Sequence, residues 1–327
     1  MKKSVKGAGL IACLSLMVGC SQQILNGDSK VAVINSGVEP ENVTEWESEL
    51  DADFEVLLNA LTTSSETEAL LAFDQKYGTN MADDSSLPLA SRASSGKSSS
   101  DYEPMKDMPF NVDGAIYLSG GTSDVVGTVI DWVSPKNFPG NYYHGAVLDL
   151  DKYDPNDEEV YCLETAVTKG AGYETAGNWR TKVNARVMNP NFAVNKTKLD
   201  AAQKALDKYC DMDNKDVKYG FFKNNVDIFN PVTKSDTKTW YCTKVVWAVY
   251  DKYGIDIDTN SNAIDYTTSG LYSIVKNYYG VKYFYSSSKK NKAINDYINN
   301  AKNTLVLAEE IYLSPYFTKV FERIREN

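Results

Sequence analysis

The chain has 327 residues, a formal net charge of −10 at pH 7 and a hydrophobic fraction of 43%, which is typical of a globular protein. An acidic chain without a Lys/Arg block does not have the charge pattern of a nucleic-acid-binding protein. Its single histidine excludes metal sites built on two or three histidines. We therefore expect no nucleic-acid partner and no metal site, and no motif predicts a cofactor.

Residues 1–20 have the pattern of an export signal. Three lysines precede a short apolar stretch at 10–18, which is too short to span a bilayer permanently. The stretch ends in L-M-V-G-C, which resembles a bacterial lipobox whose cysteine, here Cys20, is lipidated. We expect anchoring through Cys20 in a bacterial cell envelope, at the outer membrane or cell surface rather than the inner membrane. The alternative is an ordinary signal peptide with a chance cysteine.

A polar tether is predicted over residues 21–43 and a helical hairpin over 44–80, ending near Gly78. The hairpin could brace the main domain or cover its active site. The apolar positions with helical spacing in its first helix are Trp46, Leu50, Phe54, Leu57, Leu58 and Leu61.

A Ser-rich linker is predicted over residues 81–103, the main domain over 104–288, and C-terminal helices over 289–327. Other expected elements, in chain order, are a strand ending at 119, a glycine-rich loop at 169–179, a strand at 181–188, a helix at 197–210, a strand at 281–285, and helices at 289–303 and 305–325.

His144 begins an apolar strand directly after a loop that contains proline and glycine. Loop–strand junctions of this kind hold a side chain rigidly while leaving it open to a cleft. An acidic turn at 151–159 leads to a second strand at 160–167, which should pair antiparallel to the first. The acidic turn does not match the calcium-loop pattern, because Asp154 stands where that pattern needs glycine.

Glu164 lies in the middle of that second strand. A carboxylate in an apolar strand is costly unless it is paired, and an antiparallel pairing could bring Glu164 beside His144, where it would orient the imidazole. The alternative is an exposed position on an edge strand.

Cys242 lies just before an apolar helical run within W-Y-C-T-K-V-V-W-A-V-Y. A helix N-terminus favours the thiolate over the thiol, and a thiolate needs a base, for which His144 is the only histidine. The alternative is a buried structural cysteine. Cys162 and Cys210 are more typical of structural residues and could form a disulfide in an oxidising compartment.

These residues, in this order, resemble the circularly permuted papain-like amidases of the NlpC-type superfamily, in particular its YiiX/YaeF-like branch. The matching segments are Y-H-G-A-V-L at His144, C-L-E-T-A at Glu164 and Y-C-T-K-V-V-W-A-V-Y at Cys242, and the similarity covers roughly residues 110–285. Thr243 and Lys244 stand where the family often has serine and glutamate.

The resemblance implies an α+β permuted papain-like core, in which a small antiparallel sheet packs on the cysteine-bearing helix. It implies a cysteine peptidase or amidase mechanism with Cys242 as nucleophile, His144 as base and Glu164 as the orienting carboxylate. The Cys242 N–H and the Tyr241 side chain would stabilise the oxyanion, with Tyr143 beside them. Aromatic residues expected near the cleft are Tyr142, Tyr143, Trp179, Phe221 and Phe222.

Three functions remain open at this stage. The first is a membrane-anchored hydrolase that cleaves an amide bond in a cell-wall (peptidoglycan) peptide or a lipid-linked amide. The second is a thiol acyltransferase or lipid deacylase of the lecithin retinol acyltransferase-like type. The third is a non-catalytic surface lipoprotein that uses the fold for binding.

Overall fold

The computed structural model describes residues 30–61, 65–83, 102–121, 133–135, 142–167, 170–210, 216–223, 227–258 and 263–325. The predicted signal peptide with Cys20 and most of the predicted linker lie outside these residues. The described residues form two compact units. The first contains residues 30–83 with Ser273–Ile294, and the second contains the other described residues.

The first unit is helical. Its helices are α2 (Val31–Ser36), α3 (Val43–Ala60), α4 (Glu66–Tyr77), most of α11 (Gly270–Lys282) and the first part of α12 (Ser287–Thr304). All six apolar positions predicted to share one face of the first helix are buried. The side chain of Asn42 caps α3 by accepting the N–H of Glu45, and Gly78 ends α4 in the left-handed conformation.

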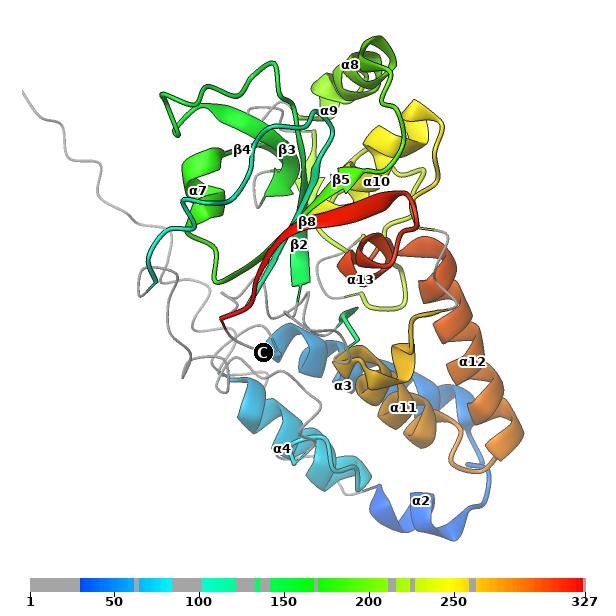
Figure 1. The fold of residues 1–327 in the computed structure, drawn as a ribbon. Coiled ribbons are helices and arrows are strands. Elements are labelled where there is room, and N and C mark those ends of the chain that lie inside the picture. The colour runs from blue at the N-terminus through cyan, green and yellow to red at the C-terminus, as the bar shows by residue number, and fades with distance from the viewer. Residues whose placement is uncertain are drawn as a thin grey trace, which may run out of the picture. The chain divides into compact units, whose positions relative to one another are not determined.

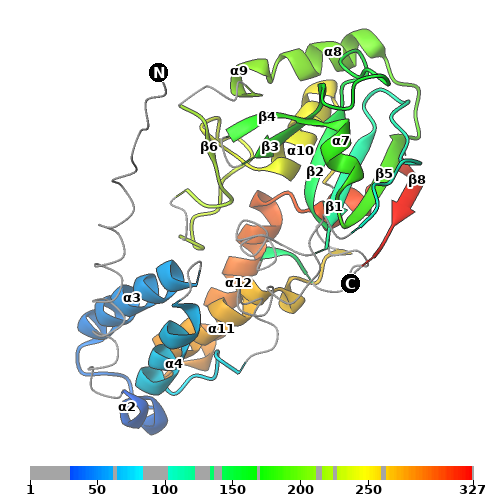
Figure 2. The same ribbon diagram turned by 90° about the vertical axis from the view of Figure 1, so that its left-hand side faces the viewer.

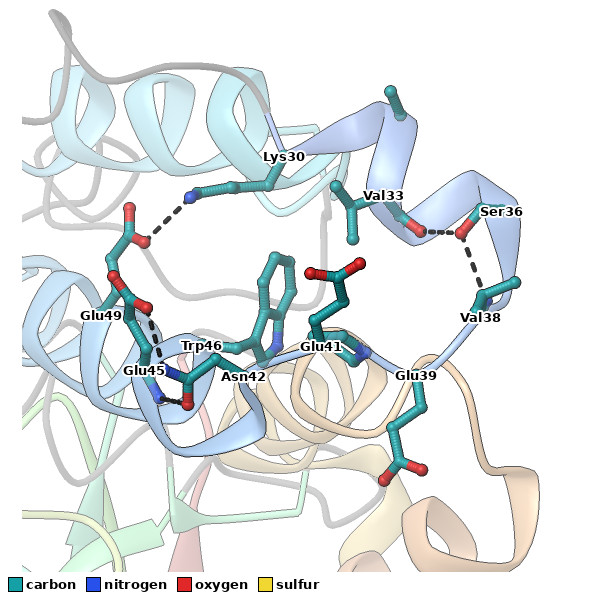
Figure 3. Close-up of a pocket in the computed structure, with 12 residues that line it drawn as sticks. Lys30, Val33, Ser36, Val38, Glu39, Glu41, Asn42, Glu45, Trp46 and Glu49 are labelled. Atoms are coloured by element: carbon teal, nitrogen blue, oxygen red, sulfur yellow. Dashed lines mark hydrogen bonds and ion pairs between the residues drawn. The ribbon is translucent and has the colours of Figure 1, made fainter.

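An open groove of about 660 Å³ lies between α2 and the start of α3 in this unit, and Figure 3 shows the residues that line it. Trp46 lies among glutamates in the groove, and two of these acids, Glu45 and Glu49, have structural roles. Glu49 forms ion pairs of 2.9 Å with both Lys30 and Lys76. Glu45 accepts the side-chain amide of Asn42 at the helix cap. Helix capping and ion pairing therefore account for the positions of Glu45 and Glu49.

The second unit is built on an antiparallel sheet with strand order β4-β3-β2-β1-β5-β8 (Figure 1). The strands are β1 (Ile116–Gly120), β2 (Tyr142–Leu148), β3 (Tyr161–Val167), β4 (Gly170–Thr175), β5 (Asn184–Pro190) and β8 (Phe317–Arg323). A short parallel pair, β6 (Lys218–Tyr219) and β7 (Thr239–Trp240), leads into the cysteine-bearing helix. The predicted α+β class, with a small antiparallel sheet and several helices, is confirmed.

Helix α10 (Cys242–Tyr253) packs against β2 and β3, and α8 (Lys196–Lys204) packs against α10 (Figure 2). Gly145 on β2 allows the close approach. A Cβ at this position would lie 3.3 Å from methyl groups of both Thr243 and Val246. The absence of a side chain at Gly145 therefore brings the start of α10 directly onto the strand that carries His144.

The remaining helices of this unit are α7 (Ala176–Arg180), α9 (Asp207–Cys210), the short η3 (Tyr266–Thr268) and α13 (Ala308–Tyr312). An apolar cluster is formed by sheet residues together with α7 and the chain before β1. Its largest members are Met105, Phe110, Tyr117, Leu148, Leu163 and Trp179.

Among the described residues, no helix is both long enough and apolar enough to cross a membrane.

Four predicted elements are wrong. The single helix expected at 197–210 is divided by a turn at residues 205–206 into α8 and α9. Where a glycine-rich loop was expected at 169–179, the described residues form β4 and α7, because the backbone of β4 completes the sheet beside β3. Residues 281–285 are not a strand, since α11 continues to Lys282 and a turn follows. Residues 305–325 are not one helix: α13 is short, and β8 then pairs with β5.

Candidate active site

Cys242 is the first residue of α10, and its side chain has no exposed surface. Its backbone N–H belongs to the first turn, where amides have no partner within the helix. The sulfur atom lies 3.5 Å from the carbonyl oxygen of Tyr143, to which the thiol can donate. Backbone N–H groups of Gly145 and Thr243 donate to the sulfur and favour the thiolate.

His144 reaches this sulfur from the neighbouring strand. It lies near the start of β2, as the sequence predicts, and its side chain is 12% exposed. A side-chain hydrogen bond joins the imidazole to Cys242. Trp179 stacks on the imidazole with ring centroids 5.3 Å apart and planes 16° apart. The stacking and the two hydrogen-bond partners fix the ring on the nucleophile.

The carboxylate that holds His144 belongs to Glu174 on β4. Its Oε2 lies 2.6 Å from Nε2 of His144, and its Oε1 lies 3.3 Å from Nζ of Lys182. Because Nε2 is occupied by Glu174, Nδ1 is the ring nitrogen that can face the thiol. This order of thiol, imidazole and carboxylate is that of a cysteine nucleophile with an oriented base.

Glu164 does not contact His144, so the predicted orienting carboxylate is corrected. Glu164 pairs directly with Val147 in the sheet, and residues opposite each other share a face. His144 lies three residues from Val147, and alternation therefore places it on the other face. The alternative of an exposed edge position is also wrong, since Glu164 is fully buried.

The sheet register explains why Glu174 is on the correct face. Glu174 pairs with Leu163, and Leu163 pairs with Leu148. Leu148 lies four residues from His144 on β2 and therefore shares its face. The regular pairing that runs from Val167 opposite Gly170 to Leu163 opposite Glu174 sets this alignment, and the register shift at Tyr161 comes after it. The sequence signal for Glu174 is weak: it is a single acid between Tyr173 and Thr175 in a glycine-rich stretch.

The electrostatics of the site favour an ion pair. Burial alone would lower the pKa of His144, but the charges of Glu174 and Cys242 raise it to about 9. Burial alone would raise the pKa of the Cys242 thiol, but His144 and the backbone amides lower it. Burial also opposes ionisation of Glu174, yet His144 and Lys182 hold its pKa at about 2. The favoured state is thiolate, imidazolium and carboxylate.

Tyr241 precedes the nucleophile as the N-cap residue of α10 and is fully buried. Its hydroxyl oxygen accepts the N–H of Val306 at 2.9 Å, and its ring stacks on Phe221 at 4.3 Å. These contacts give Tyr241 an anchoring role, and its role as an oxyanion donor stays a prediction. Tyr143 lies next to the site through its carbonyl group, and its own side chain is half-buried.

Most of the aromatic residues that were expected near the cleft are buried in the structure. Tyr142 is buried against Tyr312 and donates its hydroxyl to Glu322 at 3.0 Å. Phe221 and Phe222 are buried as well. Of this group, Trp179 touches a catalytic candidate directly, through its stacking on His144. Phe221 stacks on Tyr241, Tyr143 approaches the Cys242 sulfur through its carbonyl oxygen, and Tyr142 and Phe222 are buried in packing.

Lys244 is turned away from the nucleophile. Its buried ammonium group donates to the carbonyl oxygens of Asp236 and Thr239, at 2.5 and 2.9 Å. Burial lowers its pKa to about 8. The causes that lower the pKa of Cys242 are His144 and backbone amides, so this lysine supports the loop before α10 rather than the thiolate.

Cys162 is a buried free thiol whose pKa is raised to about 11 by burial. The disulfide considered between Cys162 and Cys210 is therefore not formed, although the side chain of Cys210 lies outside the described atoms. Within the described part of the chain, no group of three or more His, Cys, Asp or Glu side chains could hold a metal ion.

Comparison with known proteins gives little beyond this geometry. No family model matches the chain, and no curated protein matches it. Among solved structures, the crystal structure of metalloprotein yiiX from Escherichia coli O157:H7 is similar to it, with 15% sequence identity and a TM-score of 0.41. The alignment covers 66% of this chain and 99% of that one.

Proposed function

We propose that this chain is a cysteine hydrolase that cleaves an amide bond, with Cys242 as nucleophile, His144 as base and acid, and Glu174 as the orienting carboxylate. One observation carries the proposal. The imidazole of His144 hydrogen-bonds to the thiol at the start of α10, while its Nε2 lies 2.6 Å from Glu174. Such an arrangement activates a thiol for attack on a carbonyl carbon.

The reaction follows from these roles. The Cys242 thiolate attacks the amide carbon, and the carbonyl electron pair moves to oxygen. When that pair returns, the C–N bond breaks and His144 gives its proton to the departing amine, leaving a thioester on Cys242. Water then attacks the thioester and transfers a proton to His144. The C–S bond breaks, which releases the carboxylic acid and restores the thiolate.

The oxyanion needs donors that are fixed before the reaction begins. The backbone N–H of Cys242 is one, because it lies in the first turn of α10 without a partner in the helix. We keep the Tyr241 side chain as a proposed second donor, although its hydroxyl oxygen already accepts the N–H of Val306.

We further propose that the enzyme is a bacterial lipoprotein anchored through lipidated Cys20 in the cell envelope. The L-M-V-G-C motif after an apolar stretch supports this location. The available amides there are cell-wall (peptidoglycan) peptides and lipid-linked amides, and these are the proposed substrates. The motif resemblance to NlpC-type amidases supports the same reaction class.

The test is to incubate the full chain and its Cys242→Ala variant with peptidoglycan fragments and with N-acylated lipids. We expect amine release from one substrate class, and no release by the variant. Adding an alcohol or amine acceptor shows whether the acyl group goes to water or to the acceptor, which separates hydrolysis from acyl transfer. Binding of these substrates without turnover, unchanged in the variant, would contradict the proposal in favour of a binding protein.

A further inference from the structure

Thr243, the residue after the nucleophile, connects three parts of the second unit. Its backbone N–H donates to the Cys242 sulfur. Its hydroxyl donates to the carbonyl oxygen of Val306 at 2.5 Å. Its methyl group fills the space left by the missing side chain of Gly145, next to His144. Thr243 is 1% exposed, so water cannot replace these contacts.

Val306 is a firm anchor for this residue. It is fully buried between α12 and α13, and both of its backbone polar groups are bound by residues that flank Cys242. Tyr241 accepts its N–H, and Thr243 donates to its carbonyl oxygen. The adjacent Leu307 is fixed in turn, because its N–H donates to Glu310 at 2.9 Å.

We propose that Thr243 is a positioning residue for the nucleophile: its hydroxyl ties the first turn of α10 to Val306, and its methyl sets the distance between that turn and the strand of His144. The segment around Val306 thereby becomes part of the active-site framework. This inference rests on the proposed function, because it assigns Thr243 to the geometry of the Cys242–His144 pair. Thr243 itself does not touch the reacting atoms of a substrate.

Substitutions at Thr243 separate its contacts. Thr243→Val keeps a methyl group and removes the hydroxyl, whereas Thr243→Ser keeps the hydroxyl and removes the methyl. Thr243→Ala compared with Thr243→Ser tests the hydroxyl again if the valine variant does not fold. Ser269→Ala is the matched control, because Ser269 also donates a buried hydroxyl to a backbone carbonyl in this unit, that of Tyr266 at 2.9 Å.

The measurement is the rate of iodoacetamide alkylation of Cys242 in the full chain as a function of pH, resolved from the other cysteines by mass spectrometry, with urea unfolding of each variant alongside. At about pH 6 we expect Thr243→Val to react about three- to tenfold more slowly than the original chain, with its pH profile moved to higher pH. Thr243→Ser keeps the hydroxyl bond but loses the methyl group that packs at Gly145, so it should react about two- to threefold more slowly, a smaller loss than in Thr243→Val. Ser269→Ala should lower stability while leaving the profile in place.

Two results would overturn the proposal. If Thr243→Val, or Thr243→Ala relative to Thr243→Ser, keeps the original profile and only loses stability, Thr243 is merely structural. An equal shift in Ser269→Ala would show a general effect of lost buried hydrogen bonds. In both cases the original chain still reacts at acidic pH, so the proposed function stands. An original chain that is itself unreactive there contradicts both proposals.

Discussion

Nε2 of His144 lies 2.6 Å from Oε2 of Glu174, although the two residues come from strands that are not neighbours, since β3 separates β2 from β4. Lys182 contacts the same carboxylate on its other oxygen, at 3.3 Å. The base of the proposed catalytic pair is therefore held by an acid 30 residues further along the chain. If Glu174 orients His144, substitutions at Glu174 should have effects that the same substitutions at Glu164 do not have.

Glu174→Gln should lower turnover on the order of a hundredfold, because the imidazole loses both its charge partner and its fixed orientation. Glu164→Gln is the matched control, since it makes the same change on the opposite face of the sheet, and turnover should stay close to the original. The check is steady-state kinetics with any substrate found by amine release. Equal losses in the two variants would remove Glu174 from its assigned role.

The pH dependence of turnover should be bell-shaped. The rising limb reports ionisation of Cys242, whose pKa is lowered by His144, and the falling limb should lie near pH 9, where His144 loses its proton. Because Glu174 raises the pKa of His144, Glu174→Gln should move the falling limb to lower pH. A falling limb that does not move would show that Glu174 does not act on the imidazolium.

The stability of the His144–Glu174 pair has its own pH window. The raised pKa of His144 stabilises the fold below its ordinary value of 6.5, and this contribution is lost as pH rises toward 9. The lowered pKa of Glu174 stabilises the fold above its ordinary value of 4.5, and this contribution is lost as pH falls toward 2. Urea unfolding should therefore show the largest difference between the original chain and Glu174→Gln between these two ordinary values. A difference independent of pH would contradict the pair.

Gly145→Ala should disturb both the fold and the site. Its Cβ would lie 3.3 Å from methyl groups of Thr243 and Val246, which forces α10 away from β2 at a cost of about 1–3 kcal/mol. Alkylation of Cys242 at acidic pH should fall in parallel. Gly280→Ala is the control, because a Cβ there meets nothing within 4 Å and alanine suits the interior of α11. An equal effect in both variants would contradict the packing argument.

Tyr241→Phe should cost about 1–3 kcal/mol in the free energy of unfolding, because the buried N–H of Val306 loses its acceptor. If the Tyr241 hydroxyl also stabilises the oxyanion, turnover should fall on the order of a hundredfold. Lower stability with unchanged turnover would leave Tyr241 as an anchor and remove it from the oxyanion site.

Cys20→Ser tests the proposed anchor separately from the chemistry. Expressed with its own leader in a bacterial host, the original chain should fractionate with membranes and carry a lipid mass on Cys20, while the variant should not. Alkylation of Cys242 should be the same in both proteins. If the original chain is found in the membrane fraction but Cys20 carries no lipid mass, the lipoprotein proposal is contradicted.

The sequence is sufficient to predict where the proposed nucleophile and base lie, because both positions depend on local patterns. The apolar spacing after Cys242 places the thiol at a helix start, and the apolar run after His144 places the imidazole at a strand start. The helix over 43–60 was equally predictable, since its buried face follows one simple period.

The position of Glu174, the proposed orienting carboxylate, depends on strand pairing, which no local sequence pattern sets. A shift of one residue in strand register moves every side chain to the other face, and the sequence does not show that residues 170–175 form a strand with Glu174 opposite Leu163. The same limit explains β8, whose pairing with β5 joins segments more than a hundred residues apart. Local spacing alone predicted a helix there.

The central claim is that Cys242 and His144 form a reactive ion pair, and site-resolved iodoacetamide alkylation from acidic to alkaline pH tests it most directly, with His144→Ala alongside. The account predicts rapid labelling of Cys242 well below the ordinary thiol pKa of about 8.5, and loss of that labelling in His144→Ala. Cys162, whose pKa is raised to about 11, should react far more slowly than Cys242 at acidic and neutral pH. An inert Cys242, or identical labelling with and without His144, would contradict the account.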